Sequence, residues 1–288
     1  MKKLNTLDPK DIYEIQEEVK RIKLNFNGDI KKFVREENII LIYLPINQSN
    51  ENLSFSSLYM YLRKDDMYFM GVNSSDYYDN QLFAIAHELY HHYEKDEVIH
   101  LSRISLDEEQ HNKRESKANR FAAELLLSEE DLKSEIKKIN NYDIDMNNCT
   151  KEKIYRLIAK LHCEYKLPYK AIVKRLKEIC AINEENYNML YNINSREKGS
   201  KYYNIGISMN KEVFEKLNEK TNEYGIEGSD LEDVIGNYEA GFIDIRELIE
   251  DLGKFDKKIS DFGYENELEI DEVDLEEFDS LFSKYEDE

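Results

Sequence analysis

The feature that most constrains this chain is an apolar segment, residues 83–93, that carries three of the six histidines. Its sequence, FAIAHELYHHY, favours a buried helix. Residues four apart return to the same face of an α-helix, so His87 and His91 present two imidazole rings to one point. Glu88 points into the adjacent space. Because unpaired imidazoles on a buried helix would cost free energy, the pattern predicts a helix that binds a metal ion.

The order His87, Glu88, His91 is the HExxH arrangement of zinc hydrolases. A catalytic zinc ion takes three protein ligands and leaves its fourth position to water, whose pKa it lowers to about 7. Glu88 would lie beside that water as the general base. The sequence therefore predicts a hydrolase with one Zn²⁺ per chain.

The third ligand is expected on a second helix, residues 114–127. Glu115 shares a face with Ala118 and Ala122, and these small residues allow the second helix to approach the first closely. Glu124 falls on the opposite side, so Glu115 is the better third ligand. The alternative is that Glu115 is an exposed carboxylate near a helix start, where the helix dipole favours it.

Two segments resemble the paired motif of the ImmA/IrrE family of bacterial metallopeptidases: FAIAHELYH at residues 83–91 and ESKANRFAAELLL at residues 115–127. The resemblance covers roughly residues 35–180 and implies a zincin-like metallopeptidase fold. Tyr90 stands where family members commonly have glycine, and this departure leaves every ligand in place. By position, the resemblance implies zinc ligands at His87, His91 and Glu115 and a catalytic base at Glu88.

The residues before the metal helix predict a small sheet. Amphipathic helices are expected over 9–27 and 30–36, followed by a buried strand over 39–44. Residues 58–62 and 67–70 flank a charged turn and are expected to form a β-hairpin. We therefore expect an α+β fold in which a small antiparallel sheet packs on the metal helix. An edge strand beside the site could pair with a peptide substrate, although a hairpin that only completes the core fits equally well.

Helical patterns dominate the chain beyond residue 127. Residues 151–164 and 169–179 predict two helices joined by a short turn, and residues 151–178 hold nine basic and three acidic side chains. The pair resembles a helix-turn-helix, but its apolar faces and a similar pair in the family favour packing over DNA reading. The polar stretch 184–205 is expected to be a connection. Further helices are expected over 129–139, 211–222, 229–238 and 244–252.

The net charge of −21 is concentrated near the C-terminus, where residues 196–288 hold 28 acidic and 11 basic side chains. This charge disfavours direct nucleic-acid binding. We expect a zinc metallopeptidase domain over 1–182, a helical accessory region over 183–260 and a flexible acidic tail over 261–288. The acidic region could also inhibit the enzyme by occupying the basic surface or the cleft of the same chain.

The composition points to the cytoplasm. No stretch approaches the about 20 apolar residues of a membrane span, and the N-terminus lacks the apolar core of a secretory signal. The three cysteines, Cys149, Cys163 and Cys180, are odd in number and widely spaced. They are expected to be free thiols in a reducing compartment.

These patterns predict a zinc-dependent endopeptidase. The family resemblance implies a protein substrate, namely a helix-turn-helix transcriptional repressor of a mobile element or a stress response. The alternative is a regulatory binding protein, of the anti-repressor or toxin-partner type, with a structural zinc. The tetrahedral oxyanion needs a hydrogen-bond donor besides zinc, and the candidates are His111, Tyr93 and His92. For each of them, an ordinary role as a partly exposed side chain is the favoured interpretation. The sequence leaves the oligomeric state open.

Overall fold

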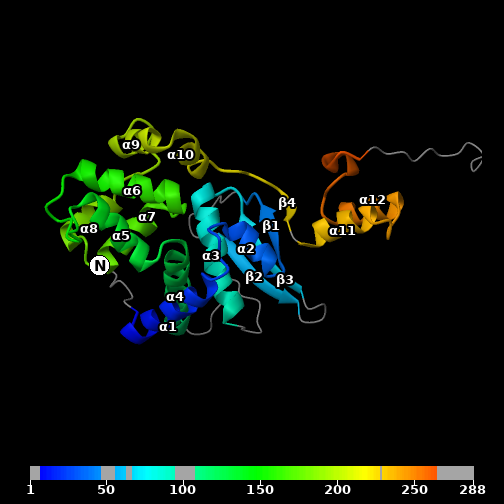
Figure 1. Cartoon of the computed structure of the whole chain (residues 1–288), viewed down its shortest axis with the longest axis horizontal. Coiled ribbons are helices and arrows are strands. Elements are labelled where there is room, and N and C mark those ends of the chain that lie inside the picture. Colours follow the sequence, from blue (N-terminus) through cyan, green and yellow to red (C-terminus); the bar gives the residue numbers. More distant parts are fainter. Residues whose placement is uncertain (1–6, 47–55, 63–66, 95–107, 228, 265–288) are drawn as a thin grey trace, which may run out of the picture. The chain divides into compact units, whose positions relative to one another are not determined.

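A four-stranded sheet with the strand order β2-β3-β1-β4 forms one layer of the structure (Figure 1). The computed structural model of the whole chain describes residues 7–46, 56–62, 67–94, 108–227 and 229–264. The strands are β1 (Ile39–Leu44), β2 (Ser57–Leu62), β3 (Met67–Asn73) and β4 (Gly225–Glu227). The predicted α+β class is confirmed, as are the buried strand β1 and the hairpin of β2 and β3.

The sheet is mixed, which corrects the expectation of an antiparallel sheet. β2 and β4 each pair antiparallel with a neighbour, but β1 pairs parallel with β3, and Ile39 lies opposite Tyr68. The pattern of apolar residues predicts where a strand lies in the sequence but not which strand it pairs with. Here the hairpin inserts its second strand beside β1, so β2 becomes an edge strand of the sheet. β4 has three residues and joins the sheet from a distant part of the chain, so no local pattern predicted it.

The helix α3 (Tyr78–Tyr93), which carries the predicted metal ligands, contacts β2 and β3 with one face and the helix α4 (Glu108–Leu126) with another (Figure 1). The helix α1 (Pro9–Ile22) packs on α4, and the short helix α2 (Ile30–Glu36) packs on α3 and β1. Thus α3 is held between the sheet and the helical part of the fold. Its apolar positions are almost entirely buried, as the sequence of residues 83–93 predicts.

Within the described residues, six further helices form the helical part of the fold before residue 229. They are α5 (Glu129–Ile139), α6 (Lys151–Tyr165), α7 (Tyr169–Glu178), α8 (Glu184–Tyr191), α9 (Lys201–Met209) and α10 (Lys211–Leu217). Several basic side chains of the α6 and α7 pair are bound inside the fold. Lys160 bonds Glu135, and Arg175 bonds Glu124. This agrees with a packing role for the pair.

The expectation of a connection over 184–205 is wrong, because α8 and most of α9 form there. The asparagine and tyrosine residues that suggested a connection instead cap a helix or pack in the core. Asn183 caps the start of α8, while Tyr187 and Tyr202 are buried. Tertiary burial of the aromatic rings thus overrides the polar composition of the segment. The division of the chain expected at residue 182 stays a prediction, although contact between α9 and α6 groups these helices with residues 1–229.

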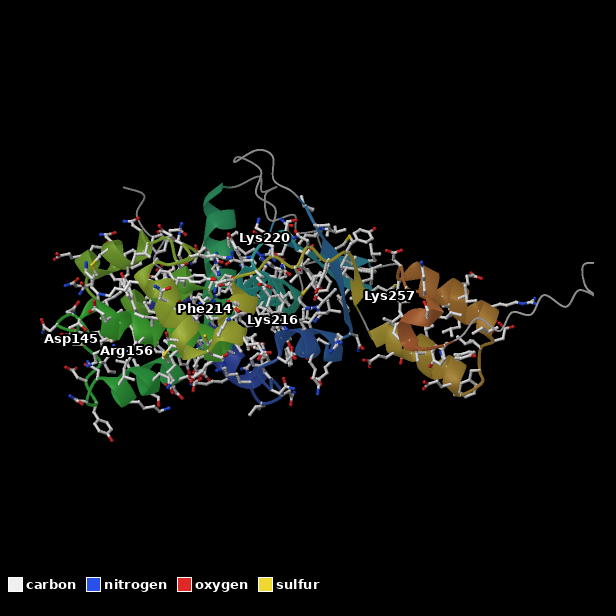
Figure 2. The ribbon with its side chains drawn as sticks, turned by 90° about the horizontal axis from the view of Figure 1, so that it is seen from above. Asp145, Arg156, Phe214, Lys216, Lys220 and Lys257 are labelled. Carbon is white, nitrogen blue, oxygen red and sulfur yellow. The ribbon has the colours of Figure 1, made fainter. Side chains whose placement is uncertain are left out.

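The segment around α10 reaches back to the start of α3. Phe214, labelled in Figure 2, is fully buried, and the centre of its ring lies 6.0 Å from the centre of the Tyr202 ring. Lys220, also labelled in Figure 2, forms an isolated bridge with Tyr77 and places its Nζ 5.6 Å from the centre of the Tyr77 ring. This contact holds the residue that immediately precedes α3.

The described residues from 230 to 264 belong to a second compact unit. Its helices are α11 (Ser229–Glu239), which begins at the boundary, and α12 (Ile245–Lys254), and both were predicted. A short 3-10 helix (Ile259–Phe262) extends into the segment that we expected to be a tail, and it buries Ile259 against Leu248 and Leu252. The rest of the expected tail, residues 265–288, lies outside the described residues.

The structure bears on two features of the sequence analysis, namely the absence of a membrane span and the state of the cysteines. Among the described helices, none combines the length and the apolar character of a membrane span. Cys149, Cys163 and Cys180 are all free thiols.

A buried ion network ties the start of α3 to the rest of the fold. The Asp79 carboxylate accepts two hydrogen bonds from Arg196, at 2.6 and 2.8 Å, and lies 3.0 Å from Nε2 of His162. Burial opposes ionisation of Asp79, but His162 and Arg196 outweigh it and lower the pKa of this carboxyl. The network therefore anchors α3 to α6 and to the segment that precedes α9.

The network predicts that Asp79→Asn lowers the free energy of unfolding by about 3–5 kcal/mol, because it leaves the guanidinium of Arg196 without the buried carboxylate that it binds. The carboxylate's contribution is fully present above its ordinary pKa of 3.8 and is lost as the pH falls through its lower folded value. The difference from wild type should therefore shrink below that pH. Urea unfolding at several pH values measures both effects. The exposed neighbour Glu197 offers a control, since Glu197→Gln should change stability by less than about 0.5 kcal/mol.

Candidate metal centre

The α3 and α4 helices approach closely because small side chains lie between them. Ala118 and Ala122 of α4 are fully buried in this contact region, as the sequence predicted. Tyr90, the departure from the family pattern, is accommodated by packing its ring on Phe121 with the ring centres 5.6 Å apart. The larger residue therefore fills space between the helices and displaces none of the predicted ligands.

Three predicted ligands converge where the helices meet. Nε2 of His87 lies 3.1 Å from one carboxylate oxygen of Glu115, and Nε2 of His91 lies 3.6 Å from the other. One ligand atom from each of the three residues lies within 4.8 Å of the other two. Both histidines are buried and Glu115 is partly exposed. The helical spacing of four residues on α3 and the single carboxylate on α4 thus produce one cluster.

The orientation of His87 is set by a residue to which the sequence analysis assigned no function. Nδ1 of His87 lies 3.1 Å from Oδ1 of Asn119, which stands one turn after Glu115 on α4. This contact leaves Nε2 directed toward Glu115. Burial disfavours a charged imidazole, but the carboxylates of Glu115 and Glu88 together with the Asn119 contact outweigh burial and raise the pKa of His87. The signal that could have revealed Asn119 is its position four residues after the predicted ligand.

Glu88 follows His87 on α3, and its buried carboxylate contacts β2 rather than Glu115. Its Oε1 accepts a hydrogen bond of 2.7 Å from the hydroxyl of Ser57, at the start of β2. Its Oε2 is buried and has no hydrogen-bond partner among the described residues. Burial raises the pKa of Glu88, whereas the charge on His87 and the Ser57 hydroxyl oppose that rise. One oxygen of Glu88 is thus held by Ser57, and the other has no hydrogen-bond partner in the part of the chain that the structure describes.

Two of the three candidate oxyanion donors, His92 and Tyr93, contact other side chains. The hydroxyl of Tyr59 lies 3.0 Å from Nδ1 of His92, which places His92 against β2. The Tyr93 ring packs toward Phe121. His111 falls in a part of α4 whose side chains lie outside the described residues. The structure therefore assigns no oxyanion donor among the three.

Glu124, the rejected alternative ligand, is placed away from the cluster as expected. It is buried and accepts hydrogen bonds from Arg175 at 2.7 Å and from the backbone N–H of Glu129 at 2.8 Å. Nη2 of Arg120 lies 3.0 Å away. This carboxylate belongs to a buried ion network between α4 and α7.

The donors that converge here fit a zinc ion. Two imidazole nitrogens and one carboxylate oxygen form a ligand set that catalytic zinc sites use. The buried oxygen of Glu88 that lacks a partner in the described part of the chain is a further polar atom that bound water would satisfy. A helix with two histidines, a second helix with a carboxylate and a small sheet beside them define a zincin-like metallopeptidase domain.

Comparison with protein families agrees with this class. Residues 35–177 match the Peptidase M78 family model, described as an IrrE N-terminal-like domain. Through this domain the chain belongs to the ImmA/IrrE family of metallopeptidases, and the matched range includes both metal-site helices. No curated protein in the comparison matches the chain.

The geometry predicts graded effects on metal binding. Glu115→Gln should leave little zinc bound, because it removes a charged ligand. Asn119→Ala should weaken zinc binding by about 10–100-fold, because the orientation of His87 is lost. Zinc titration against a competing chelator measures both effects. Glu197→Gln serves as the control for loss of an exposed carboxylate, and unchanged affinity in Glu115→Gln would contradict the assigned cluster.

Proposed function

We propose that this protein is a zinc-dependent endopeptidase that hydrolyses a peptide bond in a protein substrate. The observation that carries the proposal is the convergence of His87, His91 and Glu115 beside a separate buried carboxylate, that of Glu88. A site that only stabilised the fold would need the three ligands but not Glu88. The presence of both features favours catalysis over the regulatory binding protein considered as the alternative.

In the proposed site, His87 and His91 would hold zinc through Nε2, and Glu115 would hold it through its carboxylate. When bound, zinc supplies Lewis acidity, which makes a water molecule more acidic and polarises the carbonyl of the peptide bond. The protein's part is to keep these three side chains in place. Asn119 does so for His87 through its side-chain contact.

Glu88 is the proposed general base. Ser57 holds Oε1, so Oε2 can take a proton from the attacking water and later give it to the leaving amine. Burial raises the pKa of Glu88, and a more basic carboxylate suits a general base. Ser57 is therefore a proposed positioning residue.

The edge strand β2 supports a peptide as the substrate. β2 is the outermost strand of the sheet on the β3 side, and it begins at Ser57 beside the proposed base. An extended peptide could add to this edge through main-chain hydrogen bonds. Such a peptide would run past Glu88.

The proposed substrate is a helix-turn-helix transcriptional repressor, and the proposed location is the cytoplasm. Membership of the ImmA/IrrE family supports the substrate class. The three free thiols suit a reducing compartment. Incubation of the zinc-loaded protein with the repressor encoded beside its gene should yield two fragments. A repressor that stays intact, while other peptides are cleaved, would contradict the substrate class alone.

Glu88→Gln tests the mechanism. The variant should bind zinc as wild type does, because Glu88 is not among the ligands. Its cleavage rate should fall by about 10²–10⁴-fold, since the amide cannot accept the proton. Zinc content and peptide cleavage are measured on the same preparation.

The outcome also separates the two functions. Wild-type cleavage rates in the zinc-loaded Glu88→Gln variant would refute the assigned base. If the wild-type protein cleaves nothing and the variant retains biological activity, the regulatory binding protein is the better account.

A further inference from the structure

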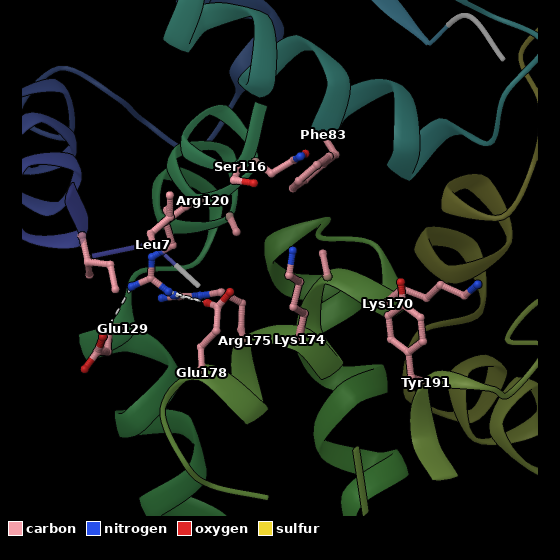
Figure 3. A pocket seen from close by; sticks show the side chains of 14 residues that line it. Leu7, Phe83, Ser116, Arg120, Glu129, Lys170, Lys174, Arg175, Glu178 and Tyr191 are labelled. Atoms are coloured by element: carbon pink, nitrogen blue, oxygen red, sulfur yellow. Dashed lines mark hydrogen bonds and ion pairs between the residues drawn. The ribbon is translucent and has the colours of Figure 1, made fainter. Parts of the chain in front are cut away.

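A cavity of about 480 Å³ opens between α1, α3, α4, α7 and α8 (Figure 3). Its volume lies in the range of sites that bind small molecules or side chains. Apolar groups form part of its wall, including the ring of Phe83 and the side chains of Ile12 and Ala123. Charged groups from α4, α5 and α7 and a few uncharged polar side chains form much of the rest. No part of the proposed catalytic mechanism uses this space.

The cavity adjoins the metal centre. Phe83 stands one helical turn before His87, and Ser116 directly follows Glu115. Asn119 lines the cavity and also contacts His87. If the scissile bond of a peptide lies at the metal, a side chain of a neighbouring residue of that peptide could therefore reach this cavity.

The arginines at the cavity are neutralised within the protein. Arg175 contacts Glu124 at 2.7 Å and Glu178 at 3.0 Å, and Arg120 contacts the same two carboxylates. Both guanidinium groups are buried. Their Nε atoms have no hydrogen-bond partner within the described residues, although both residues line the cavity. Buried donors of this kind are usually satisfied by an acceptor, which a ligand oxygen could supply.

The two lysines at the cavity carry charge that no carboxylate of the described residues pairs with. Lys174 extends from α7 toward Phe83 (Figure 3), and in the described structure no carboxylate forms an ion pair with it. The same holds for Lys170, whose Nζ lies 5.2 Å from the centre of the Tyr191 ring. The wall of the cavity thus contributes four cationic and two anionic side chains. A negatively charged group would find complementary charge there.

We propose that this cavity is a side-chain subsite of the peptidase and that it receives an acidic side chain of the substrate, from a residue that flanks the cleaved bond. Lys174 provides the counter-charge, and Phe83 contacts the methylene groups of that side chain. The inference rests on the proposed peptidase function and adds a substrate preference to it.

The test uses the full-length, zinc-loaded protein and a peptide library prepared from a whole proteome. Mass spectrometry of the products gives the residues on either side of each cleaved bond. We expect aspartate and glutamate to be enriched at one position near the bond. Lys174→Glu should abolish this enrichment and replace it with lysine and arginine, because the charge of the subsite is reversed.

Two further variants sharpen the test. Lys174→Met keeps the apolar stem and removes the charge, so it should lower the preference for acidic residues about fivefold even if charge reversal impairs folding. Lys151→Glu makes the same charge change at an exposed position on α6, outside the cavity, and should leave the cleavage profile unchanged.

The possible failures are distinguishable. Cleavage without acidic enrichment, or with the same enrichment in both Lys174 variants, overturns the subsite and leaves the peptidase function intact. If wild type binds zinc and cleaves no peptide in the library and no repressor, the peptidase function fails and the subsite fails with it.

Discussion

The close contact between α3 and α4 is the constraint on which the rest of the structure depends. Two imidazoles on one helix define only part of a metal site, and the third donor must come from elsewhere in the chain. Small residues such as Ala118 and Ala122 allow α4 to approach until Glu115 lies 3.1 Å from His87. A larger residue at either alanine would move this carboxylate away from the imidazoles.

The surrounding structure holds these two helices by polar contacts as well as by apolar packing. Asp79 fixes the start of α3 to Arg196 and His162, while Glu124 fixes the end of α4 to α7. Buried ion pairs of this kind add little net stability but are costly to break, so they favour one arrangement over others. The proposed functional groups lie between these two anchors, where small displacements of a helix would alter the cluster.

Much of the metal centre could be predicted because its geometry is local. The spacing of His87 and His91 defines a shared helical face, and the same reasoning separates Glu115 from Glu124. Ser57 could not be found in this way, since its contact with Glu88 depends on how β2 pairs and packs. Tertiary structure alone brings these two residues together.

The errors in the predicted fold also arise where the structure depends on long-range contacts and not on local sequence patterns. Each strand of the hairpin has its own periodicity, but the placement of β3 beside β1 depends on long-range pairing. The helices α8 and α9 were missed because residues 184–205 are rich in asparagine and tyrosine, although Tyr187 and Tyr202 are buried in the core. Local patterns therefore predicted most elements near the metal centre, and long-range burial determined the remainder.

The central claim is that two imidazoles from α3 and one carboxylate from α4 bind a single zinc ion. X-ray absorption spectroscopy at the zinc edge of the metal-loaded protein tests this claim most directly. The account predicts two imidazole nitrogens, with oxygen completing the coordination and no sulfur. Sulfur ligation from Cys149, Cys163 or Cys180, or coordination by fewer than two imidazoles, would contradict it.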